Sequence, residues 1–389
     1  MSAICGIIEL SGKAPNFDEL KKMGKAMSFR SRGDFGAYLG KGVGIIQRGE
    51  SENGELPFIA SKGGHAYVVA FDGELQNISC ICSVAGIFDG LSDEEIILES
   101  YLWDGLDVLG FLDGEYAFCL YDSHRNQVIL ARDARGGKPL YYYYDKERLY
   151  FSSEIKALFS VEGIGKSVDV ALLERHILGE EDIGGKIYKN IKELGTGECV
   201  SVTGFGVKNF SLNLGGTDGN CLGVCRGKYK AEYIPSLEEL LLGLVVAYDY
   251  PLFDMAIPTL VYEINKKNAV FIPNGVCVSE VERKYFYERA DRLRYLLDGI
   301  STKKSTDIRE KVKSPKQLEK ELCNLFDQMV GENRGNILRI MKLFERDISS
   351  ELKKEKDIAK RIGIRGRLCQ LCMWSELYSP IFECRSSLE

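Results

Sequence analysis

The chain has 389 residues, of which 45% are hydrophobic and 28% charged, the composition of a water-soluble globular protein. This length exceeds one ordinary hydrophobic core and predicts two domains. A net charge of −6 gives no reason to expect a nucleic-acid or anionic-membrane partner. No apolar run reaches the roughly 18 residues of a membrane span, and we expect no secretory signal at the N-terminus. A cytoplasmic protein with reduced cysteines is the expectation.

Up to residue 211 the sequence is rich in strands. Asn16 is placed to cap a helix over residues 17–28, and Ser92 to cap one that begins with three acidic residues. A strand over residues 65–71 is predicted to end in a tight turn at Asp72-Gly73. A meander of four further strands is expected at residues 115–122, 127–133, 139–145 and 148–153. Strand layers with intervening helices predict an α+β sandwich of sheets covered by helices.

The character of the chain changes near residue 212. Residues 212–235 are rich in glycine and predict a linker between a domain at 1–211 and a second domain at 236–389. The second domain is expected to be mostly helical, with one buried strand at 269–272. Its expected helices lie at 236–248, 254–266, 279–298, 315–330 and along a charged run at 336–362.

Cys5 is the first candidate catalytic residue, because it lies in the apolar run 4–10 close to the chain's beginning. A thiol beside a free α-amino group would place a nucleophile next to a base whose pKa is roughly 7.7–8.0. This is the logic of N-terminal nucleophile (Ntn) hydrolases. Residues 1–4 precede Cys5, however, so removal of Met1 alone would not free its amine.

Two cysteine pairs raise the question of a metal site: Cys221 with Cys225, and Cys369 with Cys372. A structural zinc site needs four ligands, and the pairs lie far apart in sequence with no histidine beside either. Buried or half-buried thiols are the favoured interpretation, and no metal or cofactor is predicted.

Seven motifs occur in a fixed order and together resemble the glutaminase domain of class II glutamine amidotransferases, specifically the asparagine synthetase family. The resemblance covers about half the chain. The motifs are Ile4-Cys5-Gly6-Ile7; Arg48; Asp72-Gly73-Glu74-Leu75-Gln76-Asn77; Ser92-Asp93-Glu94-Glu95; Leu112-Asp113-Gly114-Glu115-Tyr116-Ala117-Phe118; Arg132-Asp133 with Gly136, Lys138 and Pro139; and Ser153-Glu154-Ile155-Lys156-Ala157-Leu158.

The resemblance implies an Ntn αββα sandwich and a role for each matched residue. Cys5 would attack the glutamine side-chain amide and form a thioester. Arg48 would bind the substrate carboxylate, and Glu74 with Asp93 the substrate ammonium. Gly73 would donate its backbone N–H to the oxyanion. Taken singly, Arg48 and Asp93 are better explained as surface charges, and only the ordered motifs favour their roles in the site.

Two departures from the family pattern weaken the catalytic prediction. The family's oxyanion-hole Asn is Asp72 here, and an ionised carboxylate has no N–H to donate. Loss of one such donor costs about 3–4 kcal/mol, although a protonated Asp72 would still act. The second departure is the leader, residues 1–4. The family's Pro between Gly33 and Asp34 is also missing, which alters a loop.

The second half resembles the family's ATP-pyrophosphatase domain in a shortened, degenerate form. The nearest match to its phosphate loop is Leu214-Gly215-Gly216-Thr217-Asp218-Gly219, which lacks both serines. In Asn274-Gly275-Val276-Cys277-Val278-Ser279-Glu280, the acidic positions of the metal–phosphate loop are Val276 and Ser279. We therefore expect a reduced, mostly helical α/β domain whose ATP site is lost.

Three functions stay open at this point. The first is a glutaminase-type amidotransferase that hydrolyses glutamine and passes ammonia to an acceptor, which could be a partner protein. The second is an inactive pseudoenzyme with a binding or regulatory role. The third is a true ATP-dependent amide synthetase with an atypical nucleotide site. Resemblance to bacterial family members also makes a homodimer an expectation.

Overall fold

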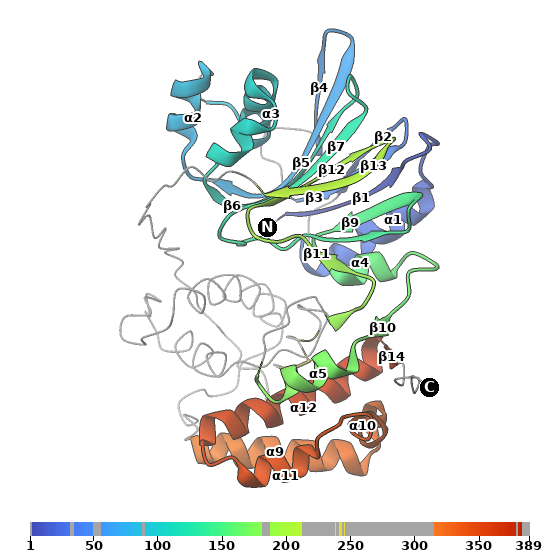
Figure 1. The fold of residues 1–389 in the computed structure, drawn as a ribbon, viewed down its shortest axis with the longest axis vertical. Coiled ribbons are helices and arrows are strands. Elements are labelled where there is room, and N and C mark those ends of the chain that lie inside the picture. The colour runs from blue at the N-terminus through green and yellow to red at the C-terminus, as the bar shows by residue number, and fades with distance from the viewer. Residues whose placement is uncertain are drawn as a thin grey trace, which may run out of the picture. The chain divides into compact units, whose positions relative to one another are not determined.

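The computed structural model describes residues 2–31, 35–49, 56–87, 90–180, 187–211, 238, 241, 242, 245, 315–378 and 380–382. Contacts divide the chain into two units (Figure 1). Unit 1 comprises residues 1–164 and 190–220, and unit 2 comprises residues 165–189 and 221–389. Residues 165–180 and 187–189 therefore pack with the C-terminal helices, although they precede the boundary expected near residue 212. That linker and boundary lie outside the described residues and stay a prediction.

Unit 1 contains two six-stranded antiparallel sheets (Figure 1). In the first sheet, β1 (Ala3–Glu9) lies between β9 (Arg148–Ser152) and β3 (Val43–Arg48). In spatial order its strands are β11 (Lys192–Glu193), β8 (Tyr141–Tyr144), β9 (Arg148–Ser152), β1 (Ala3–Glu9), β3 (Val43–Arg48) and β2 (Phe35–Gly40). The second sheet runs β13 (Gly206–Ser211), β12 (Glu198–Thr203), β7 (Gln127–Arg132), β6 (Gly114–Asp122), β5 (His65–Leu75) and β4 (Phe58–Lys62).

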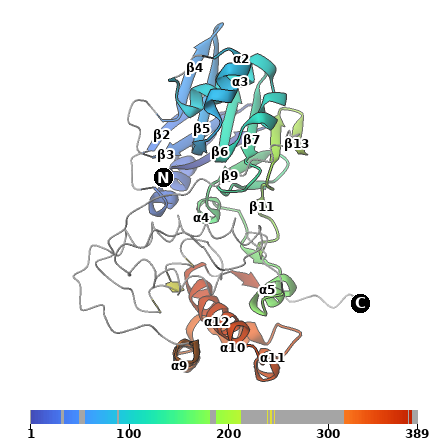
Figure 2. The same ribbon diagram turned by 90° about the vertical axis from the view of Figure 1, so that its left-hand side faces the viewer.

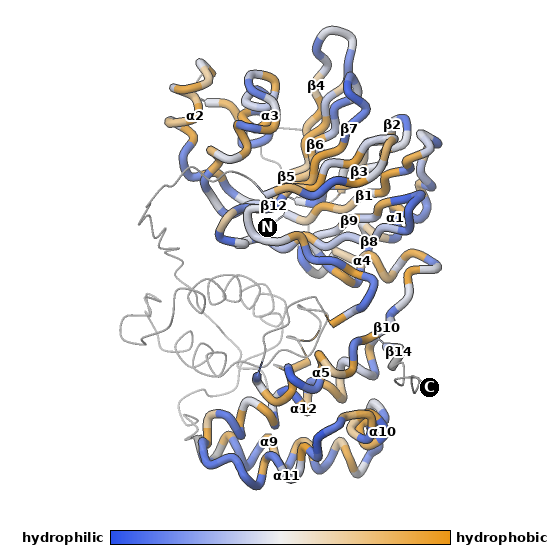
Figure 3. The backbone as a smooth tube through the Cα atoms, viewed as in Figure 1, coloured by the Kyte–Doolittle hydropathy of each residue, from blue (hydrophilic) through white to orange (hydrophobic). Residues whose placement is uncertain are grey.

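The two sheets face each other across an apolar core. Alternate residues of the strands point into it, among them Ile4, Ile8, Val43, Val68 and Phe151. The strands in the middle of this unit are correspondingly hydrophobic (Figure 3). Ile4, the residue before Cys5, is therefore part of the core between the sheets.

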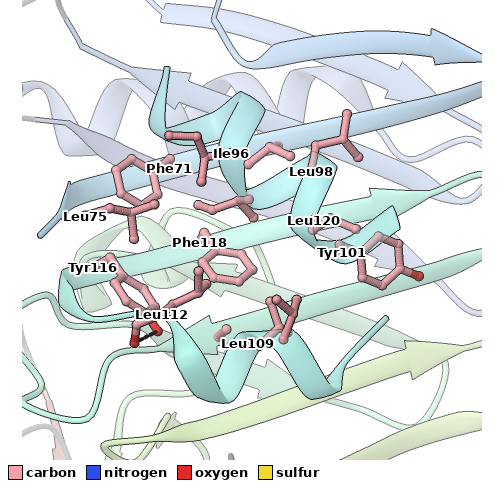
Figure 4. Close-up of a cluster of buried hydrophobic side chains, with 14 of the residues drawn as sticks. Phe71, Leu75, Ile96, Leu98, Tyr101, Leu109, Leu112, Tyr116, Phe118 and Leu120 are labelled. Atoms are coloured by element: carbon pink, nitrogen blue, oxygen red, sulfur yellow. Dashed lines mark hydrogen bonds between the residues drawn. The ribbon is translucent and has the colours of Figure 1, made fainter. Parts of the chain in front are cut away.

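Helices cover the two outer faces of the sheet pair (Figures 1 and 2). On the first sheet lie α1 (Phe17–Ala26), the 3₁₀ turn η1 (Met27–Phe29) and α4 (Ile155–Phe159). On the second lie α2 (Ile78–Ala85), α3 (Asp93–Asp104) and η2 (Asp107–Phe111). Here Phe71, Ile96, Tyr116 and Phe118 pack in a second apolar cluster (Figure 4). This confirms the predicted four-layer αββα sandwich.

Several local predictions in unit 1 are confirmed and two are wrong. Asn16 accepts hydrogen bonds from the backbone of α1, and Ser92 caps α3 in a capping box with Glu95. The four predicted strands are β6 to β9, but they do not form one meander, because β6 and β7 belong to the second sheet while β8 and β9 belong to the first. The tight turn predicted at Asp72-Gly73 is also wrong: β5 continues through both residues to Leu75.

Unit 2 is helical wherever it is described, apart from one short pair of strands. Its elements are β10 (Ser167–Val168), α5 (Val170–Ile177), α9 (Pro315–Gly331), η4 (Arg334–Asn336), α10 (Ile337–Met341), α11 (Ile348–Lys354), α12 (Ile358–Tyr378) and β14 (Ile381–Phe382). The charged run at 336–362 is not one helix, because Asp347 and Asp357 start new helices with side-chain caps. The strand expected at 269–272 and the helices expected at 254–266 and 279–298 lie outside the described residues.

Polar contacts hold Glu174 of α5 and Tyr188 against the C-terminal part of unit 2. The Glu174 carboxylate accepts hydrogen bonds from the backbone N–H groups of Glu345 and Arg346, and from the Arg346 Nε at 2.7 Å. The indole N–H of Trp374 on α12 donates to the Tyr188 hydroxyl at 2.9 Å. Cys369 and Cys372 are buried free thiols on α12. Among the described helices, none is long and apolar enough to cross a membrane.

Candidate active site

Cys5 is the third residue of β1 and lies opposite Ile46 of β3 and Ser152 of β9. Since Ile4 faces the core between the sheets, Cys5 faces the other side of its sheet. Ser152 lies on that same side and contacts the Met27 sulfur of η1 at 3.3 Å. The thiol is fully buried, at 0% exposure. Cys5 is thus a strand-interior residue rather than an exposed strand end.

Burial raises the pKa of the Cys5 thiol far above its ordinary value, because a thiolate would lose its hydration. The Arg48 guanidinium acts in the opposite direction and favours the thiolate, but its influence is the smaller of the two. At neutral pH the thiol is therefore protonated in this conformation. A protonated, buried thiol is not a nucleophile.

Residues 2–4 of the leader are built into the fold. Ala3 and Ile4 belong to β1, lie opposite Arg48 and Gln47 of β3, and are 0% exposed. The Ile4 N–H donates to Ser153 Oγ at 3.0 Å, and the Ser153 N–H donates to the Ile4 carbonyl at 2.9 Å. The nitrogen of Cys5 is consequently a peptide nitrogen, and the base on which Ntn chemistry depends is absent from this state.

Arg48 is the last residue of β3, and its side chain is almost fully buried. Its Nε donates to the Ser31 carbonyl at 3.1 Å, and Nη1 approaches the Gly24 carbonyl at 3.5 Å. The guanidinium carbon lies 5.7 Å from the centre of the Phe35 ring. Backbone carbonyls and an aromatic face therefore fix the direction of this cation, on the strand next to Cys5.

Gly73 lies inside β5, opposite Tyr116 of β6. Its φ is +151°, and a Cβ atom at this position would lie 2.1 Å from the Glu115 carbonyl oxygen. Only glycine fits so close an approach of two strands. The backbone conformation at the predicted oxyanion donor therefore requires glycine at position 73.

Asp72, immediately before Gly73, is buried and ion-paired. Arg30 Nη2 donates to Asp72 Oδ2 at 2.8 Å, and the exposed fractions of the two side chains are 4% and 1%. Ser153 Oγ lies 3.4 Å from the same carboxylate oxygen. Asp72 Oδ1 is buried and has no hydrogen-bond partner. Asp72 thus faces a cation and a hydroxyl group, and no contact of its side chain resembles that of an oxyanion donor.

Arg30 is the residue that sequence reasoning missed. A buried aspartate at the place of the family's asparagine requires a cation nearby, because an unpaired buried charge is costly. Arg30 lies three residues before Gly33, after which the family's proline is missing. The requirement for a counter-ion was therefore the available signal, although sequence alone does not select one arginine among several.

Glu74 and Asp93 form the acidic part of the site. Asp93 is the first residue of α3, and its Oδ2 accepts a hydrogen bond from the Leu75 N–H at the end of β5, at 3.0 Å. Loss of hydration raises the pKa of the Asp93 carboxyl; the Leu75 N–H opposes this, while the charges of Glu94 and Glu74 add to it. Glu74 is exposed. The charge of Glu74 therefore acts on the Asp93 carboxyl, which lies at the end of β5 two residues beyond Gly73.

Contacts link the predicted residues within unit 1 in two groups, one around Cys5 and Asp72 and one around Asp93. Cys5 and Arg48 interact electrostatically, and Ser153 joins the residue before Cys5 to Asp72. Gly73 and Glu74 follow Asp72 in sequence, and the charge of Glu74 acts on Asp93. In the part of the chain that the structure describes, there is no group of three or more His, Cys, Asp or Glu side chains that could hold a metal ion. Both nucleotide-loop candidates, residues 214–219 and 274–280, lie outside the described residues.

Comparison with known proteins gives the class of this fold and site. Residues 1–210 match the glutamine amidotransferase domain family, GATase_6. This match spans more than half of the chain, and the chain belongs to that family.

Similar curated proteins point to one branch of it, the asparagine synthetases. Asparagine synthetase [glutamine-hydrolyzing] 2 of Bacillus subtilis is 34% identical over 171 residues, which is 41% of this chain and 22% of the relative. Asparagine synthetase B of Escherichia coli is 39% identical over 99 residues, 24% of this chain and 18% of the relative. The putative asparagine synthetase 2 of Methanocaldococcus jannaschii is 30% identical over 193 residues, 44% of this chain and 37% of the relative. The chain thus spans about a fifth to somewhat over a third of the length of these relatives.

Among solved structures, glutamine PRPP amidotransferase of B. subtilis, in complex with ADP and GMP, aligns with 64% of this chain and 59% of its own. The TM-score is 0.40 and the identity 15%.

Proposed function

We propose that unit 1 hydrolyses glutamine to glutamate and ammonia, once residues 1–4 no longer precede Cys5. The observation that carries the proposal is the position of Cys5 beside the oriented Arg48 guanidinium, in a chain of the glutamine amidotransferase family. A thiol next to a cation, with acidic groups at the end of the neighbouring sheet, fits an amino-acid substrate that carries both charges. The matched relatives bear the words "glutamine-hydrolyzing" in their names.

The chemistry divides among the residues as follows. The freed α-amine of Cys5 takes the thiol proton, and the sulfur attacks the side-chain amide carbon of glutamine. The C–N bond breaks, the amine returns the proton to the departing ammonia, and a thioester to Cys5 remains. Water then hydrolyses the thioester and releases glutamate. Arg48 binds the substrate carboxylate, and Glu74 with Asp93 binds its ammonium.

The oxyanion of the tetrahedral intermediate is the weak point of this site. The Gly73 N–H is one proposed donor, whereas Asp72 stands where the family has a donor side chain and carries a negative charge toward its buried surroundings. Arg30 offsets that charge. We therefore expect slow turnover, and a gain of up to about 10²-fold from Asp72→Asn if one donor hydrogen bond is regained.

The acceptor of the ammonia is not part of unit 1. The altered sequence at Val276 and Ser279 supports a second half without a working ATP site, so that ammonia is released or passed to another protein. A cytoplasmic protein that forms homodimers is the accompanying expectation. If the ATP chemistry has instead survived in an atypical form, Mg-ATP should raise the unfolding temperature of the full chain.

A second function, glutamine binding without turnover, is favoured by one specific observation. Cys5 is fully buried and its preceding residues are strand residues of the core. A chain that keeps residues 1–4 would have no base for the thiol. Such a protein could still bind glutamine through Arg48 and Asp93 and act as a sensor or binding subunit.

An ammonia-release assay separates these functions. We would compare the full chain, the chain that begins at Cys5, and the latter with Cys5→Ala or Asp72→Asn. Activity only in the chain that begins at Cys5, lost with Cys5→Ala and raised with Asp72→Asn, supports the hydrolase. Equal activity in the full chain and in its Cys5→Ala variant would refute the mechanism. Glutamine binding without turnover in all forms would favour the binding function.

A further inference from the structure

The backbone of residues 2–4 is held by side chains as well as by strand pairing. Arg30 Nε donates to the Ser2 carbonyl at 3.2 Å, while Nη2 of the same guanidinium binds Asp72. Ser153 Oγ accepts from the Ile4 N–H and also contacts Asp72. Arg30 and Ser153 thus each bind the backbone of the leader and also contact the buried Asp72 carboxylate.

We propose that Arg30, Asp72 and Ser153 form a binding seat for an extended peptide backbone in front of Cys5, and that residues 2–4 are its resident occupant. The proposal rests on the proposed function in one respect, because the bound residues 2–4 keep Cys5, the candidate nucleophile, buried and without a free amine. Its chemistry is specific: a guanidinium for a carbonyl at one end, a hydroxyl for an N–H two residues further on, and a carboxylate that orients both.

The geometry explains why these three residue types belong together. A guanidinium presents several donors in a rigid fork, so one arginine can bind a carboxylate and a carbonyl at the same time. A hydroxyl can accept from an N–H and donate to a carboxylate. An asparagine at position 72 would offer Arg30 only a neutral acceptor. Asp72 is therefore suited to retaining the leader, whereas an oxyanion requires a donor.

The seat also explains the burial of the leader. Residues 3 and 4 pair with β3 on one side, and the Ile4 carbonyl accepts from the Ser153 N–H on the other. This resembles the addition of a strand to a sheet. Ile4 adds a side chain to the core between the sheets. The occupant is thus fixed by backbone recognition, by one apolar anchor, and by the two polar side chains that converge on Asp72.

Thiol alkylation tests the seat without reference to glutamine turnover. The full chain is treated with iodoacetamide, and labelling of Cys5 is followed by peptide mass spectrometry. Two variants loosen the seat. Arg30→Lys keeps the charge beside Asp72 but loses the fork, and Ser153→Ala removes the hydroxyl. Arg135→Lys is the matched control, because Arg135 pairs with Asp113 at 2.8 Å elsewhere in unit 1.

We expect each seat variant to raise the labelling rate of Cys5 by about 10- to 100-fold, the factor that corresponds to loss of one charged hydrogen bond, and the control to leave it unchanged. Hydrogen exchange is measured in parallel. A loosened seat raises exchange in the peptide that contains residues 2–5, and not in β6 or β7.

Labelling within twofold of the wild type in both seat variants would overturn the proposal. Equal acceleration of exchange throughout unit 1 would also overturn it, since that result would show general destabilisation. If Arg30→Lys does not fold, Ser153→Ala alone decides. Absence of glutaminase activity in any form leaves this readout intact, so failure of the seat and failure of the proposed function are distinguishable.

Discussion

Arg30 and Asp72, 42 residues apart in sequence, form a buried ion pair at 2.8 Å within the predicted glutamine site. Both side chains are less than 5% exposed, so the pair is shielded from solvent. Breaking a buried pair from one side leaves an uncompensated charge, which is far more costly than replacing both partners. This asymmetry makes the relationship testable.

For the Arg30–Asp72 pair, we expect Arg30→Met to reduce the free energy of unfolding of unit 1 by about 3–5 kcal/mol, because the Asp72 charge would remain buried without a partner. The double variant Arg30→Met with Asp72→Asn should recover a substantial part of that loss. Hydrogen exchange at β1 and β5 measures the opening of this unit. Equal losses in the single and double variants would contradict the buried-charge explanation.

Ile4→Ala tests whether the leader is part of the core. Ile4 is fully buried between the sheets, and truncating a buried isoleucine to alanine costs about 2–5 kcal/mol. Ser2→Ala is the control, because Ser2 is half-buried and its structural contact uses the backbone carbonyl. A shift in the chemical-denaturation midpoint for Ile4→Ala, with little change for Ser2→Ala, is expected. Similar small shifts for both would mean that the leader lies outside the folded core.

Gly73→Ala should disturb β5 more than backbone strain alone explains. The new Cβ would lie 2.1 Å from the Glu115 carbonyl oxygen, so the two strands must separate. Gly12→Ala is a matched control: its φ is also positive, at +75°, but the nearest atom to a new Cβ is a flexible lysine carbon at 3.5 Å. We expect about 1–2 kcal/mol of destabilisation for the control and clearly more for Gly73→Ala, measured by thermal unfolding. Equal effects would argue against the close approach of β5 and β6.

The pH dependence of glutamine binding should report Asp93. Its carboxyl has a raised pKa, chiefly because of lost hydration, and only the ionised form attracts the substrate ammonium. As the pH falls, binding should therefore weaken at a higher pH than it would with an ordinary aspartate. Calorimetry on the Cys5→Ala chain that begins at residue 5 gives the profile.

Asp93→Asn provides the control for that profile. Binding should be about 10- to 100-fold weaker at neutral pH, and the acid-side loss should largely disappear. An unchanged profile in Asp93→Asn would assign the titration to another group, with Glu74 as the next one to replace.

The resemblance of the ordered motifs to a known family predicted the αββα sandwich, and local signals predicted its two capped helices. The continuation of β5 through Asp72-Gly73 was not predictable in this way. An Asp-Gly pair usually indicates a turn, but here pairing with β6 along the full strand overrides that preference. Local sequence carries no information about that partner strand.

The candidate site shows the same division between local and distant information. Asp93 could be placed at the start of a helix, yet its hydrogen bond to Leu75 depends on how α3 packs on β5. Arg30 and Ser153 reach Asp72 from separate parts of the chain, and neither contact has a local signature. The burial of Cys5 likewise follows from the incorporation of Ala3 and Ile4 into β1, which depends on β3 and β9.

The side-chain amide of Gln47, the residue before Arg48, makes two hydrogen bonds to the backbone of Phe71 in the other sheet. Its carboxamide donates to the Phe71 carbonyl at 3.0 Å and accepts from the Phe71 N–H at 3.1 Å. Gln47 and Arg48 are neighbours on β3, and Phe71 and Asp72 are neighbours on β5. Arg48, the predicted carboxylate-binding residue, and Asp72, which precedes the predicted oxyanion donor Gly73, are thus each one residue away from this pair of hydrogen bonds. Because both hydrogen bonds join β3 to β5, we expect a displacement of β3 to shift β5 as well.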